Sequence, residues 1–74
     1  MTLRDLIPVT EETFRIIMTE RKSNKTMLIL SNDPLIKNRE VLNLIVKDVY
    51  ADCGLNVEVK FNKYFYRYHK KLFK

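Results

Sequence analysis

Alternation of hydrophobic and polar residues along the chain predicts two β-hairpins. In residues 14–20, Phe14, Ile16 and Met18 fall on one side, as in a half-buried strand. A polar stretch at 21–25 separates this run from a second β-rich run at 26–31, so the two are predicted to pair across a loop of common length. Residues 44–50 and 55–61 form the second predicted hairpin. They are joined by a turn in which the single glycine, Gly54, is expected to have a positive φ.

The same alternation predicts which strand residues face the core. In residues 26–31 both sides are hydrophobic. We place Leu28 and Leu30 inward, with Met27 and Ile29 as the alternative set. The predicted core face therefore comprises Phe14, Ile16, Leu28, Leu30, Val46, Val57, Val59 and Phe61.

Two short helical segments are predicted outside the strands. Thr2 is a suitable N-cap for a turn that carries Leu3, Leu6 and Ile7 onto the core before Pro8 ends or bends it. Asp33-Pro34 begins a central helix that covers residues 35 to about 43. A four-stranded sheet needs one face covered, so the predicted fold is α+β. It consists of one antiparallel sheet of two hairpins, the short central helix and a C-terminal amphipathic helix.

Residues 62–74 carry that C-terminal helix. On a helical wheel, Phe61, Tyr64, Phe65, Tyr68 and Leu72 share one arc, and the basic residues share another. Asn62 is a candidate N-cap. The high β-propensity of residues 64–68 leaves a strand as the alternative. Tyr66 and Phe73 lie off the apolar arc and are therefore predicted to be free to reach a ligand.

Charge changes this picture because it is concentrated at one end of the chain. The formal net charge is +5, yet residues 1–59 hold eight Lys or Arg and nine Asp or Glu. Residues 60–74 hold six basic residues, no acid and six of the eight aromatic residues. We therefore interpret residues 1–74 as a single small domain, with an α+β body over about 1–61 and a basic aromatic segment over 62–74.

The candidate chemistry is sparse. With one cysteine, one histidine and one glycine, the chain has no intramolecular disulfide, no cysteine-based zinc site and no glycine-rich phosphate loop. Cys53 and His69 are the only nucleophile–base pair available, and no motif surrounds them. We expect a non-enzymatic protein without catalytic residues, metal ligands, cofactor or small-molecule substrate. The opening residues do not resemble a signal peptide, and no apolar run has the length of a membrane span, so the expected location is cytoplasmic.

The basic aromatic segment is the main functional signal. Its lysines and arginine suit phosphates, and its aromatic rings suit unpaired bases. The predicted partner is nucleic acid or a host protein that handles nucleic acid. The predicted binding residues are Lys60, Lys63, Arg67, Lys70, Lys71, Lys74, Tyr66 and Phe73. Alternatively, the segment is an amphipathic helix that only covers the sheet. A second functional hypothesis is a protein–protein inhibitor or adaptor of host defence or replication machinery, which docks through the sheet or a helix. A membrane partner is not expected, and a homodimer is left open.

Residues 3 to about 61 also resemble a group of short proteins. The resemblance rests on Leu3-Arg4-Asp5-Leu6-Ile7, the strand pair after it, Asn38-Arg39-Glu40-Val41, and the closing Val46-Lys47-Asp48-Val49-Tyr50 and Val57-Glu58-Val59 hairpin. The group comprises uncharacterised proteins of bacteriophages and integrative elements of Gram-positive bacteria. The resemblance implies a small β-rich α+β domain and a mobile-element setting. It transfers no functional residue, and the segment from Phe61 onward departs from the pattern.

Overall fold

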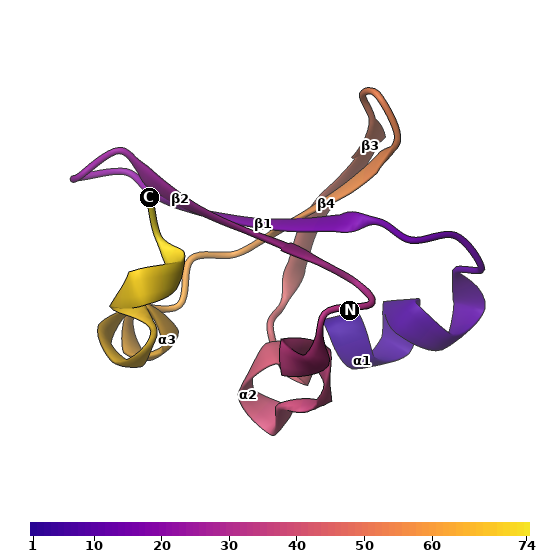
Figure 1. The fold of residues 1–74 in the computed structure, drawn as a ribbon, viewed down its shortest axis with the longest axis horizontal. Helices are drawn as coiled ribbons and strands as arrows, with labels where there is room; N and C mark the ends of the chain where they lie inside the picture. Colours follow the sequence, from indigo (N-terminus) through magenta and orange to yellow (C-terminus); the bar gives the residue numbers. More distant parts are fainter.

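The computed structural model describes residues 1–74 and shows a four-stranded sheet with its helices on one face (Figure 1). The strands are β1 (Arg15–Glu20), β2 (Lys25–Leu30), β3 (Val46–Ala51) and β4 (Leu55–Val59), in the order β2-β1-β4-β3. The α-helices are α1 (Leu3–Leu6), α2 (Arg39–Leu42) and α3 (Lys63–Tyr68), and the 3₁₀ turns are η1 (Ile7–Val9), η2 (Pro34–Lys37) and η3 (Lys70–Leu72). The chain is therefore α+β, as predicted. None of its helices has the length and apolar character needed to cross a membrane.

The sheet is mixed, so the prediction of one antiparallel sheet was wrong. Both predicted hairpins are present as antiparallel pairs, β1 with β2 and β3 with β4. The hairpins join through their inner strands, β1 and β4, which run parallel and pair Arg15–Ile17 with Asn56–Glu58. Alternation within a hairpin says nothing about how a second hairpin docks against it. That relation depends on the path of residues 31–45, which return beneath the sheet to begin β3 (Figure 1).

The inward face of β2 was also predicted incorrectly. A four-residue turn joins β1 to β2 in the register that pairs Glu20 with Lys25 and Met18 with Met27. Directly paired residues of antiparallel strands point to the same face, so Met27 follows Met18 into the core. Met27 and Ile29 are buried, whereas Leu28 is 54% exposed and Leu30 is 44% exposed. The alternative set of the sequence analysis is the correct one.

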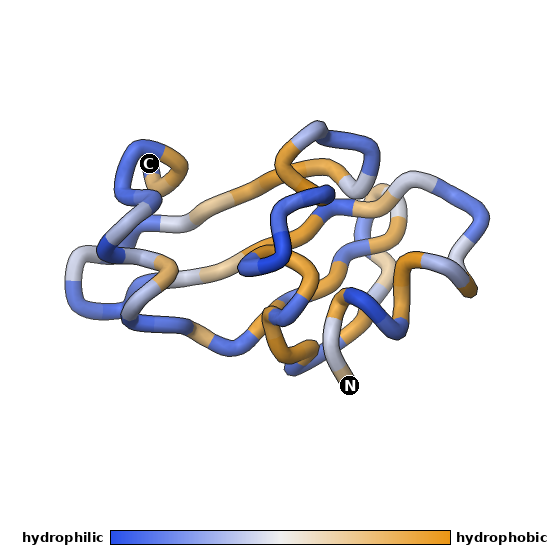
Figure 2. The backbone as a smooth tube through the Cα atoms, turned by 90° about the horizontal axis from the view of Figure 1, so that it is seen from below, coloured by the Kyte–Doolittle hydropathy of each residue, from blue (hydrophilic) through white to orange (hydrophobic).

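The core lies between the sheet and the helices, and Figure 2 shows hydrophobic positions gathered along the middle of the molecule. Phe14, Ile16, Val57 and Val59 are buried as predicted, and Val46 is half-buried. Phe61 is 44% exposed, which contradicts its predicted place in the core. It follows the end of β4, where the chain has left the sheet and alternation no longer applies. The full core cluster is Leu3, Phe14, Ile16, Met18, Met27, Ile29, Val41, Leu44, Val57, Val59, Phe65 and Phe73.

Side chains that cap backbone N–H groups define the short helices. Thr2 precedes α1 as predicted, and the Asp5 carboxylate accepts hydrogen bonds from the Thr2 N–H and hydroxyl. These bonds hold the pKa of Asp5 below its ordinary value. Asp33 caps η2 by accepting a hydrogen bond from the Leu35 N–H at 2.9 Å. The predicted central helix is interrupted at Asn38, which is extended and accepts a hydrogen bond from the Glu40 N–H at 2.8 Å. A second N-cap thus divides it into η2 and α2.

The C-terminal segment is helical, and its helix is shorter than predicted. The Asn62 side chain caps α3 by accepting a hydrogen bond from the Phe65 N–H at 3.0 Å. The helix ends at Tyr68, because His69 leaves the helical region with φ −128° and ψ 35°. After η3, the chain reaches the outer edge of β2, where the N–H and carbonyl of Lys74 bond those of Thr26 at 3.2 Å each. The segment therefore shields part of an exposed sheet edge.

Candidate functional site

The predicted basic residues divide among different parts of the surface. Arg67, Lys70 and Lys71 line one hollow of about 430 Å³, here called the basic hollow, together with Leu35, Tyr68, His69 and Leu72. Lys60 lies elsewhere, in a crevice between β1 and β4. Lys63 and Lys74 are exposed and line none of these hollows. The structure thus brings three of the six predicted cations together around one concave surface.

Tyr66 and Phe73 do not occupy the positions expected of ligand contacts. Phe73 is 5% exposed and pairs with Met27 at the edge of β2. Tyr66 is half-buried, with ring centroids 5.6 Å from Phe61 and 4.8 Å from Phe73. Both rings therefore hold the C-terminal segment against the body. The prediction that they are free to reach a ligand was wrong.

Tyr64 and Tyr68 are the exposed rings of α3, at 70% and 74% exposure. They were predicted to lie with Phe65 on the buried arc. Phe65 is buried as predicted, but the helix is rotated so that Tyr66 is half-buried beside it while Tyr64 and Tyr68 face water. A helical wheel gives the relative positions of side chains, and it does not say which side of the helix meets the sheet. The sequence did contain a signal for this rotation, because the phenol group of a tyrosine tolerates exposure to water better than the ring of a phenylalanine does.

The two exposed tyrosines lie one helical turn apart and border a second hollow. This tyrosine hollow, of about 280 Å³, is lined by Glu40, Asn43, Asn62, Tyr64, Phe65 and Tyr68. Tyr68 also lines the basic hollow, so the two hollows are neighbours with one ring between them. Exposed aromatic rings and cations therefore lie side by side on the outer surface of α3 and η3.

His69 holds this surface in place against α2. Its Nε2 lies 2.9 Å from Oε2 of Glu40, and its ring stacks at 4.4 Å between centroids on the buried ring of Phe65. Glu40 is the one acidic residue bordering the tyrosine hollow, and His69 engages its carboxylate. His69 is accordingly an anchor between two helices as well as part of the wall of the basic hollow.

The electrostatics of the basic hollow favour an anion. No Asp or Glu lines it, and none of Arg67, Lys70 and Lys71 forms a salt bridge. Lys70 Nζ lies 5.9 Å from the centroid of the Tyr66 ring, a cation–π contact that leaves its charge without an acidic partner. Three uncompensated cations at the rim of one concavity attract phosphate or carboxylate groups.

The one nucleophile–base pair noted in the sequence is not assembled. Cys53 lies in the exposed turn between β3 and β4, and His69 lies after α3 at the other end of the molecule (Figure 1). Cys53 has a φ of 53° and Gly54 has the predicted positive φ, at 121°. No group of three or more His, Cys, Asp or Glu side chains is arranged to hold a metal ion.

No family model, no curated protein and no solved structure matches this chain.

Proposed function

We propose that this protein binds single-stranded nucleic acid across the outer surface of α3 and η3. The observation that carries the proposal is the meeting of Arg67, Lys70 and Lys71 around one hollow that no acidic residue lines. In the setting that the bacteriophage and integrative-element resemblance implies, the strand is free in the cell or held by a host complex that handles nucleic acid.

The arrangement of charge and rings favours an unpaired strand. The cations of the basic hollow suit consecutive phosphates, because each such contact releases condensed counterions. Tyr64 and Tyr68 lie beside these cations and expose most of their surface, so unpaired bases can stack on them. A duplex keeps its bases stacked on one another and offers these rings no face. The proposed role is binding without catalysis.

The direct test reverses the charge of the hollow. The triple variant Arg67→Glu, Lys70→Glu and Lys71→Glu should lose binding to a fluorescein-labelled single-stranded oligonucleotide, measured by anisotropy at about 50 mM salt. All three side chains are exposed, so the fold should survive, which circular dichroism will check.

A matched control variant distinguishes binding at the basic hollow from general attraction by the net charge of the protein. The variant Lys25→Glu, Lys37→Glu and Arg39→Glu changes the net charge equally, at exposed positions that do not line the hollow. It should retain most of the affinity. Equal losses in the two triple variants would show that the protein attracts polyanions without a defined site. Absence of binding by the wild-type protein at that salt would refute the proposal.

The tyrosines test strand selectivity. Tyr64→Leu and Tyr68→Leu keep an apolar side chain and remove the stacking surface. Each should weaken single-strand binding by about 5- to 150-fold, because stacking of one base contributes about 1–3 kcal/mol. Duplex binding should change little. A similar loss for both substrates would assign the rings a structural role.

The uncovered face of the sheet supports a second candidate function, in which the protein is an inhibitor or adaptor that docks on a host protein. Leu28 and Leu30 are exposed there although they belong to a strand, and Ile17 lies opposite Leu28 in the β1–β2 pair. Leu28→Lys should abolish recovery of such a partner from nuclease-treated host lysate and leave oligonucleotide binding intact. Recovery that depends on Arg67, Lys70 and Lys71 instead would favour the first function.

A further inference from the structure

A third concave site opens between the carboxyl ends of β1 and β4. The parallel pairing of these strands spans Arg15–Ile17 and Asn56–Glu58 and then stops. Beyond it, β1 continues to Glu20 beside β2, while β4 ends at Val59. The two strands therefore separate and leave a crevice of about 380 Å³, the volume of a small-ligand pocket. Crevices at the carboxyl ends of parallel strands are common ligand sites in open sheets.

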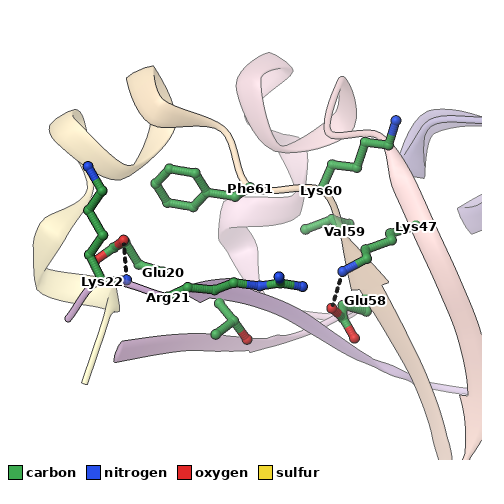
Figure 3. Close-up of a pocket in the computed structure, with 9 residues that line it drawn as sticks. Glu20, Arg21, Lys22, Lys47, Glu58, Val59, Lys60 and Phe61 are labelled. Atoms are coloured by element: carbon green, nitrogen blue, oxygen red, sulfur yellow. Dashed lines mark hydrogen bonds and ion pairs between the residues drawn. The ribbon is translucent and has the colours of Figure 1, made fainter. Parts of the chain in front are cut away.

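The charges that line the crevice leave a cation available. Its two acids are already engaged, since Glu58 forms an ion pair with Lys47 at 3.3 Å and Glu20 accepts hydrogen bonds from the β1–β2 turn. Arg21, Lys22 and Lys60 form no salt bridge. Figure 3 shows the Arg21 side chain extended along the crevice toward the Lys47–Glu58 pair, while Lys22 and Lys60 point away from that pair. The guanidinium of Arg21 is thus the cation available to a ligand in this crevice.

An aromatic ring lies across the crevice from that guanidinium. Phe61 is 44% exposed and contributes its ring to the wall opposite Arg21 (Figure 3). Tyr66 supports the ring from behind, with centroids 5.6 Å apart, so Phe61 is held in position and keeps a surface free. A guanidinium recognises phosphate oxygens in pairs, and a phenyl ring offers a stacking surface to a planar base.

We propose that this crevice binds a nucleoside 5′-monophosphate group, with the phosphate on Arg21 and the base against Phe61. The group is either a free nucleotide or the 5′-phosphorylated end of a strand, since both present the same chemistry. The site does not include the basic hollow, because none of the residues that line one lines the other. This small ligand differs from the sequence-based expectation, which included none.

The test follows backbone amide shifts by NMR during titration with adenosine 5′-monophosphate, adenosine or inorganic phosphate. The nucleotide should produce saturable shifts in residues 19–22 and 58–61, with an affinity at least tenfold above that for adenosine or phosphate alone. Equal affinity for inorganic phosphate would overturn the proposal, as would shifts confined to residues 67–72. A 5′-phosphorylated tetranucleotide distinguishes the two sources, since tighter binding of that probe assigns the site to strand ends and weaker binding assigns it to free nucleotides.

Variants assign the two contacts. Arg21 lies in an exposed turn, outside the core. The variant Arg21→Gln should therefore keep its fold and weaken nucleotide binding at least tenfold. Phe61→Leu should weaken nucleotide binding similarly and leave phosphate binding unchanged. Lys63→Gln, an exposed cation outside the crevice, should have no effect. Unchanged binding in Arg21→Gln would overturn the proposal. Nucleotide shifts should persist in the Arg67, Lys70 and Lys71 triple variant, so this inference and the proposed function can fail separately.

Discussion

At the residue scale, the burial of single side chains in β2 depends on their partners across the hairpin. Met27 and Leu28 are adjacent and similarly hydrophobic, yet Met27 is fully buried and Leu28 is 54% exposed. The difference comes from register, because Met27 lies opposite Met18 of β1. A one-residue slip would exchange the two faces.

This asymmetry predicts unequal costs of truncation. Met27→Ala should lower the free energy of unfolding by about 2–5 kcal/mol, because it removes a buried side chain and leaves a cavity. Leu28→Ala should cost well under about 1 kcal/mol, since its side chain is largely in water. Urea denaturation of the two variants measures both values, and a larger loss in Leu28→Ala would show that the exposed face of the sheet is covered in solution.

Glu20 provides a second residue-scale prediction, concerning pH. Its carboxylate accepts hydrogen bonds from the Ser23 hydroxyl, the Ser23 N–H and the Lys22 N–H, which lower its pKa below the ordinary value of about 4.5. The unfolded chain therefore binds a proton first as pH falls, so this stabilisation is complete above pH about 4.5 and is lost as pH falls through the lowered pKa.

Glu20→Gln should accordingly flatten the fall in stability over that acidic range. Thermal unfolding midpoints measured from pH 7 to about pH 3 will show whether it does. Glu12→Gln is a matched control, because Glu12 is exposed and forms no hydrogen bond. If both variants reproduce the wild-type slope, the turn contributes nothing to acid sensitivity.

At the element scale, long-range contacts hold together segments that are individually short. The longest helix has six residues, which is too short to be stable alone. Buried Phe73 packs the C-terminal segment against β2. The Arg15 side chain connects β1 to the β3–β4 turn. Its Nε donates to Oδ1 of buried Asn56 at 2.6 Å, and its guanidinium also donates to the carbonyls of Asp52 and Cys53.

Phe73→Ala tests whether the C-terminal segment is part of the cooperative fold. Loss of a buried phenylalanine should cost about 3 kcal/mol. It should also speed hydrogen exchange at the Thr26 amide, which donates to the Lys74 carbonyl. Tyr68→Ala changes an exposed ring on the same segment and should cost about 0.5 kcal/mol or less. Comparable costs would mean that the segment docks weakly.

Arg15→Met tests the connection between β1 and the β3–β4 turn. The variant leaves the buried Oδ1 of Asn56 without its donor, so we expect a loss of about 1–3 kcal/mol in the free energy of unfolding. Arg4→Met, whose guanidinium has a single long hydrogen bond of 3.4 Å to Asn43, should be nearly neutral. Chemical denaturation of both variants compares them, and a neutral Arg15→Met would show that the turn holds its own conformation.

At the scale of the whole molecule, function depends on where an uneven charge is placed. All of the positive excess follows residue 59, and the fold spreads it over the basic hollow, the crevice and the free surface of α3. The body contributes shape and little net charge. Affinity for a polyanion should therefore come from few contacts and respond to salt accordingly.

The salt dependence of the binding constant measures the number of phosphate contacts. With three phosphate contacts at Arg67, Lys70 and Lys71, the logarithm of the single-strand binding constant should fall against that of salt concentration with a slope of about −2. Anisotropy titrations between about 50 and 200 mM salt measure it. Lys70→Gln alone should reduce the slope by about 0.7. A wild-type slope near zero would exclude phosphate contacts as the source of affinity.

The sequence by itself determined the features that depend on neighbouring residues. Alternation located the strands and both hairpins, while Thr2, Asp33 and Asn62 marked helix starts, because capping acts over two or three residues. Gly54 marked a turn with positive φ. The concentration of charge after residue 59 needs no structure to be seen.

Tertiary structure alone decided the features that depend on how elements meet. The parallel docking of β1 on β4, the inward face of β2 and the rotation of α3 each bring together residues distant along the chain. A hydrophobic pattern specifies that a face is buried, and it leaves open what that face packs against. For this reason Tyr64 and Tyr68 are exposed while Phe73 is buried, and Arg21 meets Phe61 across a crevice that no local pattern could indicate.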